Sequence, residues 1–172
     1  MKKFIFILGG VKSGKSEYAV KLAKKITKKV AFIATGTPSD KEMEERIKKH
    51  KKLRPIFWKL IEEEKNIVSV LEKLNNKYEV VLIDCLGLWI SNLMAENLSE
   101  KKIEKMVNNL IKTILKLKFT TIVVSNEVGA GIVPANPVAR KFRDILGYTN
   151  KMMAKKADQV IFTVAGIPIK IK

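Results

Sequence analysis

Eight residues near the amino terminus have the types and spacing of a phosphate-binding loop. Directly after the apolar run 4–8, the pattern G-x-x-x-x-G-K-S is formed by Gly9, Gly10, Val11, Lys12, Ser13, Gly14, Lys15 and Ser16. The glycines permit tight turns, so successive backbone N–H groups can point into one concavity, and the helix that follows aims its positive end there. In such a loop Lys15 reaches the β- and γ-phosphates and the Ser16 hydroxyl helps to hold Mg²⁺. A glycine-rich turn with a chance Lys-Ser pair is the alternative.

A second stretch places a carboxylate where a phosphate loop needs one. Four apolar residues, 80–83, end in Asp84. Proteins with phosphate loops place an acid beside Mg²⁺ at the carboxyl end of a strand in this way. The pattern is common by itself, but after a phosphate loop it indicates that Asp84 supports the metal or contacts the nucleotide.

Other polar residues follow apolar runs or begin helices. Thr35, Gly36 and Thr37 come after the run 30–34, at the strand end where parallel sheets bind ligands. The two threonines are equally well explained as ordinary turn and cap residues. Glu62 opens an acidic run before a helix, where acids usually interact with the helix dipole, although one could accept a hydrogen bond from a guanine or a ribose.

Two further charged residues follow the later apolar runs. Glu127 lies in a loop with two glycines after the run 120–125. It either senses the γ-phosphate through Mg²⁺ or a water molecule, or it fixes the loop. Arg143 lies within the first two turns of the next predicted helix, where a surface salt bridge is the simpler interpretation.

His50 is the only histidine in the chain. It belongs to a predicted helix, 40–54, that begins with a capping box and stops before Pro55. Residues that are four positions apart lie on the same side of a helix, so His50 shares one flank of this helix with Arg46 and Arg54. A histidine among lysines is usually a solvated surface residue, but the nearby cations favour its neutral, nucleophilic form.

The elements that must position these residues alternate between strand and helix, which predicts one α/β domain over residues 1–172. Fully apolar strands indicate a parallel sheet that is covered on both faces. The final pair of strands predicts a hairpin at Ala165-Gly166. The predicted strands are 4–8, 30–34, 56–62, 78–84, 120–125, 159–164 and 167–171, and the predicted helices are 15–27, 40–54, 67–74, 100–117 and 137–156. The apolar stretch 86–94 predicts a buried helix or an oligomer contact.

Composition limits the class of protein. The net charge of +17 raises the possibility of a nucleic-acid partner. However, the basic residues include only four arginines, and the lysines are spread over nearly every predicted helix, so a general lysine bias is the alternative. The single cysteine, Cys85, excludes an internal disulfide and favours a reducing cytoplasm. We expect no signal peptide and no membrane span.

Taken together, motifs along nearly the whole chain are similar to those of one family. The matching residues are Gly9 to Ser16, Ile33-Ala34-Thr35, Arg46-Ile47, His50, Arg54-Pro55, Trp58, Glu62, Asp84-Cys85-Leu86, Trp89, Ser91-Asn92-Leu93, Asn126 to Pro134, Arg143-Asp144 and Gly166-Ile167-Pro168. They resemble the bifunctional adenosylcobinamide kinase / adenosylcobinamide-phosphate guanylyltransferases of cobalamin biosynthesis. One departure is Gly87, which stands where a residue with a hydroxyl group is expected.

The resemblance implies a fold and a chemistry. The fold is a RecA-like P-loop α/β fold with a mostly parallel sheet, assembled as a homotrimer with sites between subunits. The kinase step moves the γ-phosphate of ATP or GTP to a hydroxyl of adenosylcobinamide. In the second step His50 attacks the α-phosphate of GTP and carries GMP, and the product is adenosyl-GDP-cobinamide. Mg²⁺ is the implied cofactor, a corrinoid is the implied substrate, and no nucleic acid is involved.

The strand-end positions and the resemblance together predict the nucleotide contacts. Besides the phosphate loop they are Thr35, Gly36, Thr37, Lys51, Lys52, Leu53, Arg54, Glu62 and Asp84. Two other classes of protein remain as alternatives. One is a simple P-loop kinase of small molecules without a covalent step, and the other is a RecA-like ATPase that acts on nucleic acid.

Overall fold

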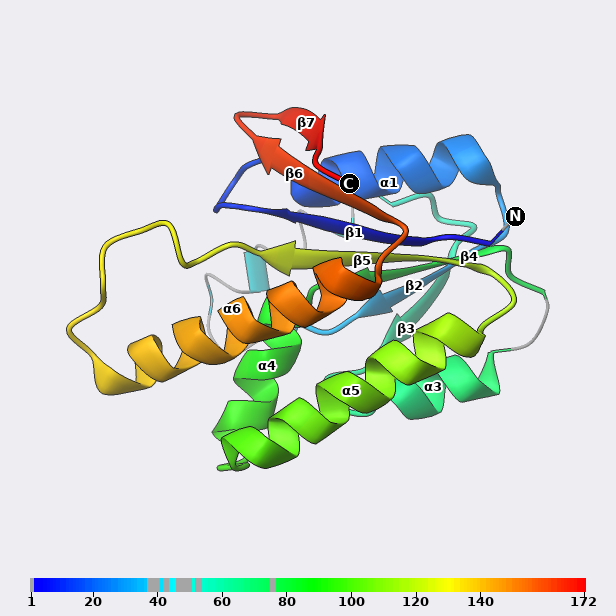
Figure 1. The fold of residues 1–172 in the computed structure, drawn as a ribbon. Helices are drawn as coiled ribbons and strands as arrows, with labels where there is room; N and C mark the ends of the chain where they lie inside the picture. The colour runs from blue at the N-terminus through cyan, green and yellow to red at the C-terminus, as the bar shows by residue number, and fades with distance from the viewer. Residues whose placement is uncertain (1, 37–40, 42–43, 46–50, 52–53, 75–76) are drawn as a thin grey trace.

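A seven-stranded sheet forms the centre of the molecule (Figure 1). The structure is a computed structural model and describes residues 2–36, 41, 44–45, 51, 54–74 and 77–172. The strand order across the sheet is β3-β2-β4-β5-β1-β6-β7, and β7 alone of these strands runs antiparallel to its neighbour. The strands are β1 (Phe4–Gly9), β2 (Val30–Ala34), β3 (Lys59–Glu62), β4 (Val80–Asp84), β5 (Thr120–Asn126), β6 (Gln159–Val164) and β7 (Ile167–Lys170).

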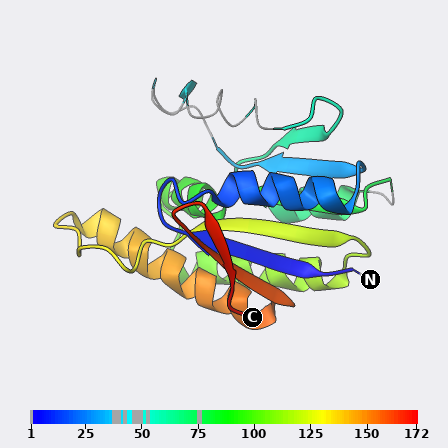
Figure 2. The ribbon, with the colours of Figure 1, turned by 90° about the horizontal axis from the view of Figure 1, so that it is seen from above.

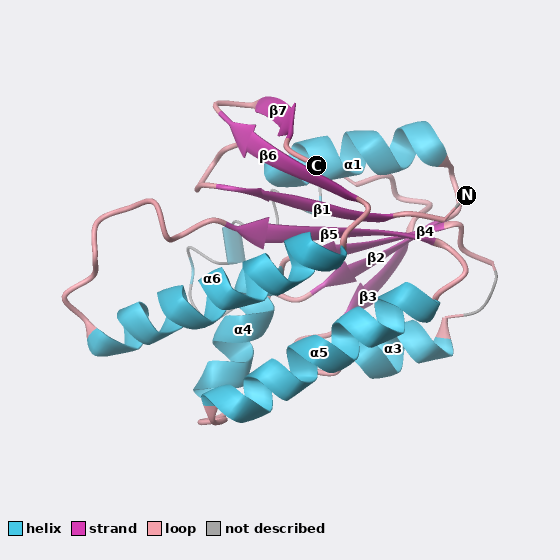
Figure 3. Cartoon of the chain, in the orientation of Figure 1, coloured by secondary structure: helices cyan, strands magenta, loops and turns pink. Residues whose placement is uncertain are grey.

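Helices cover both faces of the sheet, as fully apolar strands require. They are α1 (Lys15–Ile26), α3 (Ile67–Lys73), α4 (Leu86–Ala95), α5 (Glu100–Lys116) and α6 (Pro137–Lys156). Helix α1 lies on one face, and α3, α4, α5 and α6 lie on the other (Figures 1 and 3). In the part of the chain that the structure describes, no helix is both long enough and apolar enough to cross a membrane.

The starts of the two longest helices, α5 and α6, follow from local sequence. Ser99 caps α5 by accepting a hydrogen bond from the backbone of Lys102. Asn136 caps α6 in the same way, and Pro137 occupies the first turn, where the missing N–H group is not needed. These residue types satisfy the free N–H groups of the first turn and fix where each helix begins.

The predicted strand 56–62 is wrong at its start. Observed β3 begins at Lys59, because Ile56 and Phe57 lie in an exposed turn closed by a hydrogen bond from the backbone N–H of Trp58 to the carbonyl of Pro55 (3.1 Å). Proline favours this turn and removes a donor that a strand would use. Of the predicted helix 40–54, the described residues Lys41, Glu44, Glu45 and Lys51 are helical, and the others before Arg54 lie outside the described residues.

The apolar stretch 86–94 forms α4, which is a buried helix of this chain's own core. Leu86, Trp89, Ile90 and Leu93 are all at most 1% exposed. The indole N–H group of Trp89 donates to the carbonyl of Lys65 (2.8 Å), so its polar atom is also satisfied. The apolar character of the stretch is therefore explained by the core and needs no subunit contact.

The parallel arrangement brings the carboxyl ends of six strands to one edge of the sheet. At that edge Asp84 of β4 is level with Ala34 of β2, while Gly9 of β1 lies between Asn126 of β5 and Thr163 of β6. Seen from above, the turn of the β6–β7 hairpin, in red, lies beside the blue loop that precedes α1 (Figure 2). Loops that are far apart in sequence thus meet where ligands bind in open α/β sheets.

Candidate functional site

The phosphate-binding loop connects β1 to α1 and has the backbone geometry that anion binding requires. Gly14 adopts a left-handed conformation (φ +89°) at the N-cap of α1, and Lys12 also has a positive φ of 53°. Among the described residues, no side chain caps this helix. Because a helix leaves N–H groups unpaired in its first turn, these donors are available to a phosphate.

Lys15 is buried beneath this loop. Its residue is only 7% exposed, and its ammonium group donates to the carbonyl of Gly10 (2.5 Å) and more weakly to the hydroxyl of Ser13 (3.5 Å). Burial lowers the pKa of Lys15, and attraction from Asp84 opposes that shift. A cation held this way favours an incoming anion, since a phosphate is a stronger partner than a neutral carbonyl.

Thr35 is a structural part of the loop that follows β2. It is fully buried, and its hydroxyl donates to the carbonyl of Cys85 (2.7 Å) and accepts from the N–H group of Cys85 (2.8 Å). Its own carbonyl accepts from the side-chain amide of Asn92 (2.9 Å). These contacts fix the backbone next to Asp84, across a cis peptide bond between Asp84 and Cys85. They favour the interpretation of Thr35 as a residue that builds the turn. Gly36, the next residue, is half-buried.

Arg54 lies against the same edge. Its guanidinium group stacks on the ring of Phe32, 4.3 Å from the centroid, and burial lowers its pKa against the attraction of Asp84 and Glu62. Its Nη1 atom is buried and has no hydrogen-bond partner among the residues that the structure describes. A buried guanidinium donor without an acceptor among the described residues is able to donate to an anionic ligand. Lys51 pairs with Glu62 (2.9 Å) beside it.

His50, the predicted nucleophile, lies outside the described residues, as do Thr37, Lys52 and Leu53. The structure nevertheless places described residues that precede and follow His50 in the sequence at the carboxyl edge of the sheet. Thr35 and Gly36 precede His50, and Lys51 and Arg54 make the contacts with Glu62 and Phe32 given above. The arrangement of these flanking residues is consistent with the predicted nucleotide contacts.

Glu127 and Arg143 fix the loop after β5. The carboxylate of Glu127 accepts from the backbone N–H groups of Gly129 (2.6 Å) and Ala130 (3.2 Å). Arg143 donates to the carbonyl of Gly129 (2.6 Å). Among the described residues its contact is therefore with the backbone, and it forms no salt bridge of the kind expected as the simpler interpretation. For Glu127 these bonds favour the loop-fixing alternative.

Sequence reasoning missed the buried amide that connects α6 to the end of β5. Buried Asn150 of α6 accepts from the hydroxyl of Ser125 (2.6 Å) and donates to the carbonyl of Asn126 (2.9 Å). The signal was present, since Asn150 occupies a core position between Leu146 and Met153. At Gly87, a Cβ atom would lie 3.3 Å from the side-chain amide of Asn126, so glycine allows α4 to approach β5 closely.

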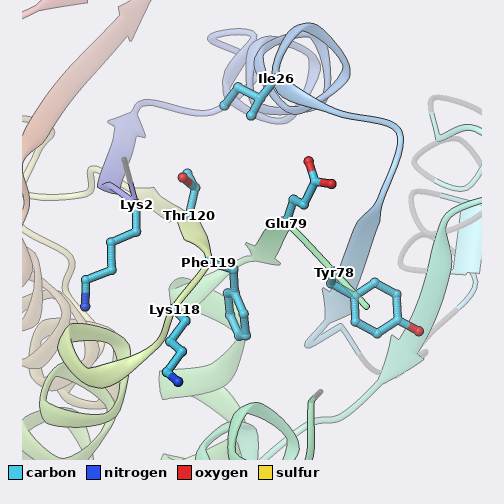
Figure 4. Close-up of a pocket in the computed structure, with 7 residues that line it drawn as sticks. All are labelled: Lys2, Ile26, Tyr78, Glu79, Lys118, Phe119 and Thr120. Carbon is cyan, nitrogen blue, oxygen red and sulfur yellow. The ribbon is translucent and has the colours of Figure 1, made fainter. Parts of the chain in front are cut away.

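The opposite edge of the sheet contains a shallow hollow of about 430 Å³ (Figure 4). It lies at the amino ends of the strands and is lined by Lys2, Ile26, Tyr78, Glu79, Lys118, Phe119 and Thr120. None of these is a predicted site residue. The predicted site residues that the structure describes therefore lie outside this hollow.

Comparisons with known proteins show the family of the chain. A family model described as cobinamide kinase / cobinamide phosphate guanyltransferase matches residues 5–171. The chain belongs to this family. The bifunctional adenosylcobalamin biosynthesis protein CobP of Pseudomonas aeruginosa is 35% identical over 166 residues, which cover 96% of this chain and 95% of that protein. Its counterpart CobU of Escherichia coli is 34% identical over 180 residues, covering 98% and 99%.

Membership of the cobinamide kinase / guanyltransferase family confirms the predicted resemblance and decides against the two alternative classes. Solved structures add the fold. One solved ATPase domain has a TM-score of 0.51 at 15% identity, covering 94% of this chain and 69% of that one. The RadB recombinase has a TM-score of 0.50 at 16% identity, covering 93% and 73%. These likenesses confirm the predicted RecA-like P-loop α/β fold.

Gly9 and Gly10 are predicted to differ in their tolerance of alanine. A Cβ atom on Gly9 would lie 2.3 Å from the carbonyl oxygen of Thr163, whereas one on Gly10 meets no described atom within 4 Å. Gly9→Ala should therefore destabilise the fold by about 2 kcal/mol or more, whereas Gly10→Ala should stay within about 0.5 kcal/mol of the parent. Urea unfolding of both variants measures the difference. Equal stability of the two would contradict the close packing of Gly9.

Cys85 is predicted to be chemically inert in the folded protein. Burial, followed by repulsion from Asp84, raises the pKa of its thiol to about 12. At pH 8 only about 10⁻⁴ of the thiol is then ionised, and the thiolate is the reactive form. Iodoacetamide at pH 8 should leave native Cys85 unmodified, as mass spectrometry would report, and should alkylate it in urea. Rapid modification of the native chain would show that the thiol is accessible.

Proposed function

We propose that this chain catalyses both reactions for which its family is named, as a single α/β domain. In the first it transfers the γ-phosphate of ATP or GTP to a hydroxyl of adenosylcobinamide. In the second it transfers GMP from GTP to the phosphorylated product, giving adenosyl-GDP-cobinamide. The observation that carries the proposal is the buried ammonium group of Lys15 beneath an uncapped helix start, beside Asp84.

In this proposal, different described residues bind different parts of the triphosphate. The first-turn N–H groups of α1 and the ammonium group of Lys15 bind the β- and γ-phosphates. The buried Nη1 atom of Arg54 donates to a phosphate oxygen, and Lys51 adds positive charge nearby. Because these cations are fixed before the nucleotide arrives, they favour the extra negative charge of the transition state.

Guanylyl transfer proceeds through His50 in this proposal. A ring nitrogen of the neutral imidazole attacks the α-phosphorus of GTP, a P–N bond forms, and the P–O bond to pyrophosphate breaks. An oxygen of the cobinamide phosphate then attacks the same phosphorus and the P–N bond breaks, which returns His50 to its starting form. Two easier displacements replace one difficult one. The segment that follows His50 in the sequence favours an anionic substrate, because it carries the positive charges of Lys51, Lys52 and Arg54. Leu53 is the remaining residue of this segment.

Ser16 and Asp84 fit a magnesium ion that arrives with the nucleotide. Both offer oxygen atoms, the donor type that Mg²⁺ prefers, and Asp84 acts electrostatically on Lys15 and Arg54. When bound, Mg²⁺ supplies charge neutralisation to the phosphates. The chain's own contribution is to fix the backbone next to Asp84, through the hydrogen bonds between the buried hydroxyl of Thr35 and the backbone of Cys85.

Assembly and location complete the proposal. We place the enzyme in the cytoplasm as a homotrimer that binds nucleotides and a corrinoid and no nucleic acid. The projecting loop after β5 (Figure 1) supports a subunit contact, since Ile132 is 97% exposed and Val133 is 63% exposed. Apolar side chains that are this exposed are typical of surfaces that another chain covers.

The test is covalent labelling with GTP and Mg²⁺. The protein should take up ³²P from α-labelled GTP in a form that is stable to base and labile to acid, as a phosphoramidate is. It should take up none from γ-labelled GTP, since that phosphate leaves with pyrophosphate. His50→Ala should abolish the label, whereas Lys41→Ala, an exposed change on the same segment, should retain it.

Two results would contradict the proposal. If the parent protein never takes up the α-label, the guanylyl-transfer step is wrong. If His50→Ala is folded and labels normally, another residue is the nucleophile. Hydrolysis of ATP that depends on DNA and falls steeply with salt would support the nucleic-acid class instead.

A further inference from the structure

The carboxyl-terminal hairpin is packed directly against the phosphate-binding loop. The turn between β6 and β7 places the N–H group of Gly166 3.2 Å from the carbonyl oxygen of Ser13. The two views agree on this neighbourhood, with the red turn beside the blue loop (Figures 1 and 2). A segment about 150 residues away in sequence thus packs against the phosphate-binding loop.

The residue types at this contact allow the two backbones to approach closely. Ala165 and Gly166 have φ values of 51° and 80°, which suit a two-residue hairpin turn. A Cβ atom on Gly14 would lie 3.2 Å from the Cα atom of Gly166. Since Gly14 itself has a positive φ, glycine is favoured at both positions, and a larger residue would separate the hairpin from the loop.

A buried pair of hydroxyl groups connects the same segments. Thr163 is 1% exposed, Ser13 is 7% exposed, and their oxygen atoms lie 2.8 Å apart. Thr163 also donates to the carbonyl of Leu8 (3.4 Å), and Ser13 accepts from the ammonium group of Lys15 (3.5 Å). Each hydroxyl has one proton, so these contacts form a one-way chain from Lys15 through Ser13 and Thr163 to the Leu8 carbonyl.

We propose that Thr163 is a positioning residue for triphosphate binding, acting through Ser13 on the phosphate-binding loop and on Lys15. Its hydroxyl holds the Ser13 side chain while the Gly166 N–H group holds the Ser13 carbonyl. With both groups of Ser13 fixed, the N–H groups of the loop remain pointed at the phosphates, and Lys15 keeps an acceptor that directs it there. The inference rests on the proposed function, since its ligand is the β,γ-phosphate portion of a nucleoside triphosphate.

Thr163→Val provides the test, because valine keeps the shape of threonine and removes the hydroxyl. Loss of one buried hydrogen bond should weaken binding by about 3- to 10-fold. The probe is α,β-methylene GTP, whose carbon bridge prevents the departure of pyrophosphate, and calorimetry in the presence of Mg²⁺ gives the affinity. GMP has no β- or γ-phosphate, so its affinity should be unchanged. Thr163→Ser restores the hydroxyl and should restore binding of the analogue.

Thr121→Val is the matched control. Thr121 is 1% exposed in β5, which β1 separates from β6, and its hydroxyl is buried with no hydrogen-bond partner in the described part of the chain. The same substitution there removes a buried hydroxyl far from the loop, since Thr121 is level with Phe4 at the amino end of β1. It should leave the affinity for the analogue unchanged.

A double-mutant cycle separates positioning from a general loss of stability. Ser13→Ala breaks the hydroxyl pair from the other side, so adding Thr163→Val to it should cause little further loss. The single variant Ser13→Ala also tests the inference if Thr163→Val does not fold, since an unchanged affinity of Ser13→Ala for the analogue would overturn it. The inference also fails if folded Thr163→Val binds the analogue like the parent, or if it loses GMP equally. Failure of the parent itself to bind the analogue would instead contradict the proposed function.

Discussion

The buried positive charge of Lys15 is the constraint on which the carboxyl edge of this sheet depends. An ammonium group on a residue that is 7% exposed has lost most of its hydration, and the lowered pKa of Lys15 reflects that loss. In the free protein its described partners are the carbonyl of Gly10 and, weakly, the hydroxyl of Ser13. Neither of these two groups carries a charge, and the loss of hydration outweighs the attraction from Asp84. The charged side chain therefore destabilises the free protein, and an arriving phosphate recovers that free energy as binding affinity.

Such a charge is useful only if the surrounding backbone is rigid, and three sets of buried hydrogen bonds provide this. Thr35 fixes the backbone beside Asp84, and Asn150 connects the end of β5 to α6. In the third set, Thr163 and the hairpin turn hold Ser13. Each set joins the end of one parallel strand to an element distant in sequence, which explains why the site needs the whole sheet.

The sequence predicted what depends on local pattern. The phosphate-binding loop, the position of Asp84 and the hairpin at residues 165–166 follow from residue types at fixed spacing, and the structure confirms these elements. What it did not predict depends on tertiary contact. The inward direction of the Thr35 hydroxyl is set by Cys85, fifty residues away, and the partner of Ser13 is Thr163 on another strand. The start of β3 was missed because the turn after Pro55 overrides the apolar character of Ile56 and Phe57.

The most direct test of the central claim is a thermal unfolding titration of Lys15→Met with GTP and Mg²⁺. Methionine keeps most of the buried side chain and removes the charge. Because the charged form of Lys15 is disfavoured in the folded state at neutral pH, the free variant should melt about 2–4 °C above the parent, equivalent to about 1 kcal/mol. The nucleotide should raise the melting temperature of the parent and leave that of the variant unchanged. A free variant that melts below the parent, or one that the nucleotide stabilises fully, would contradict this account.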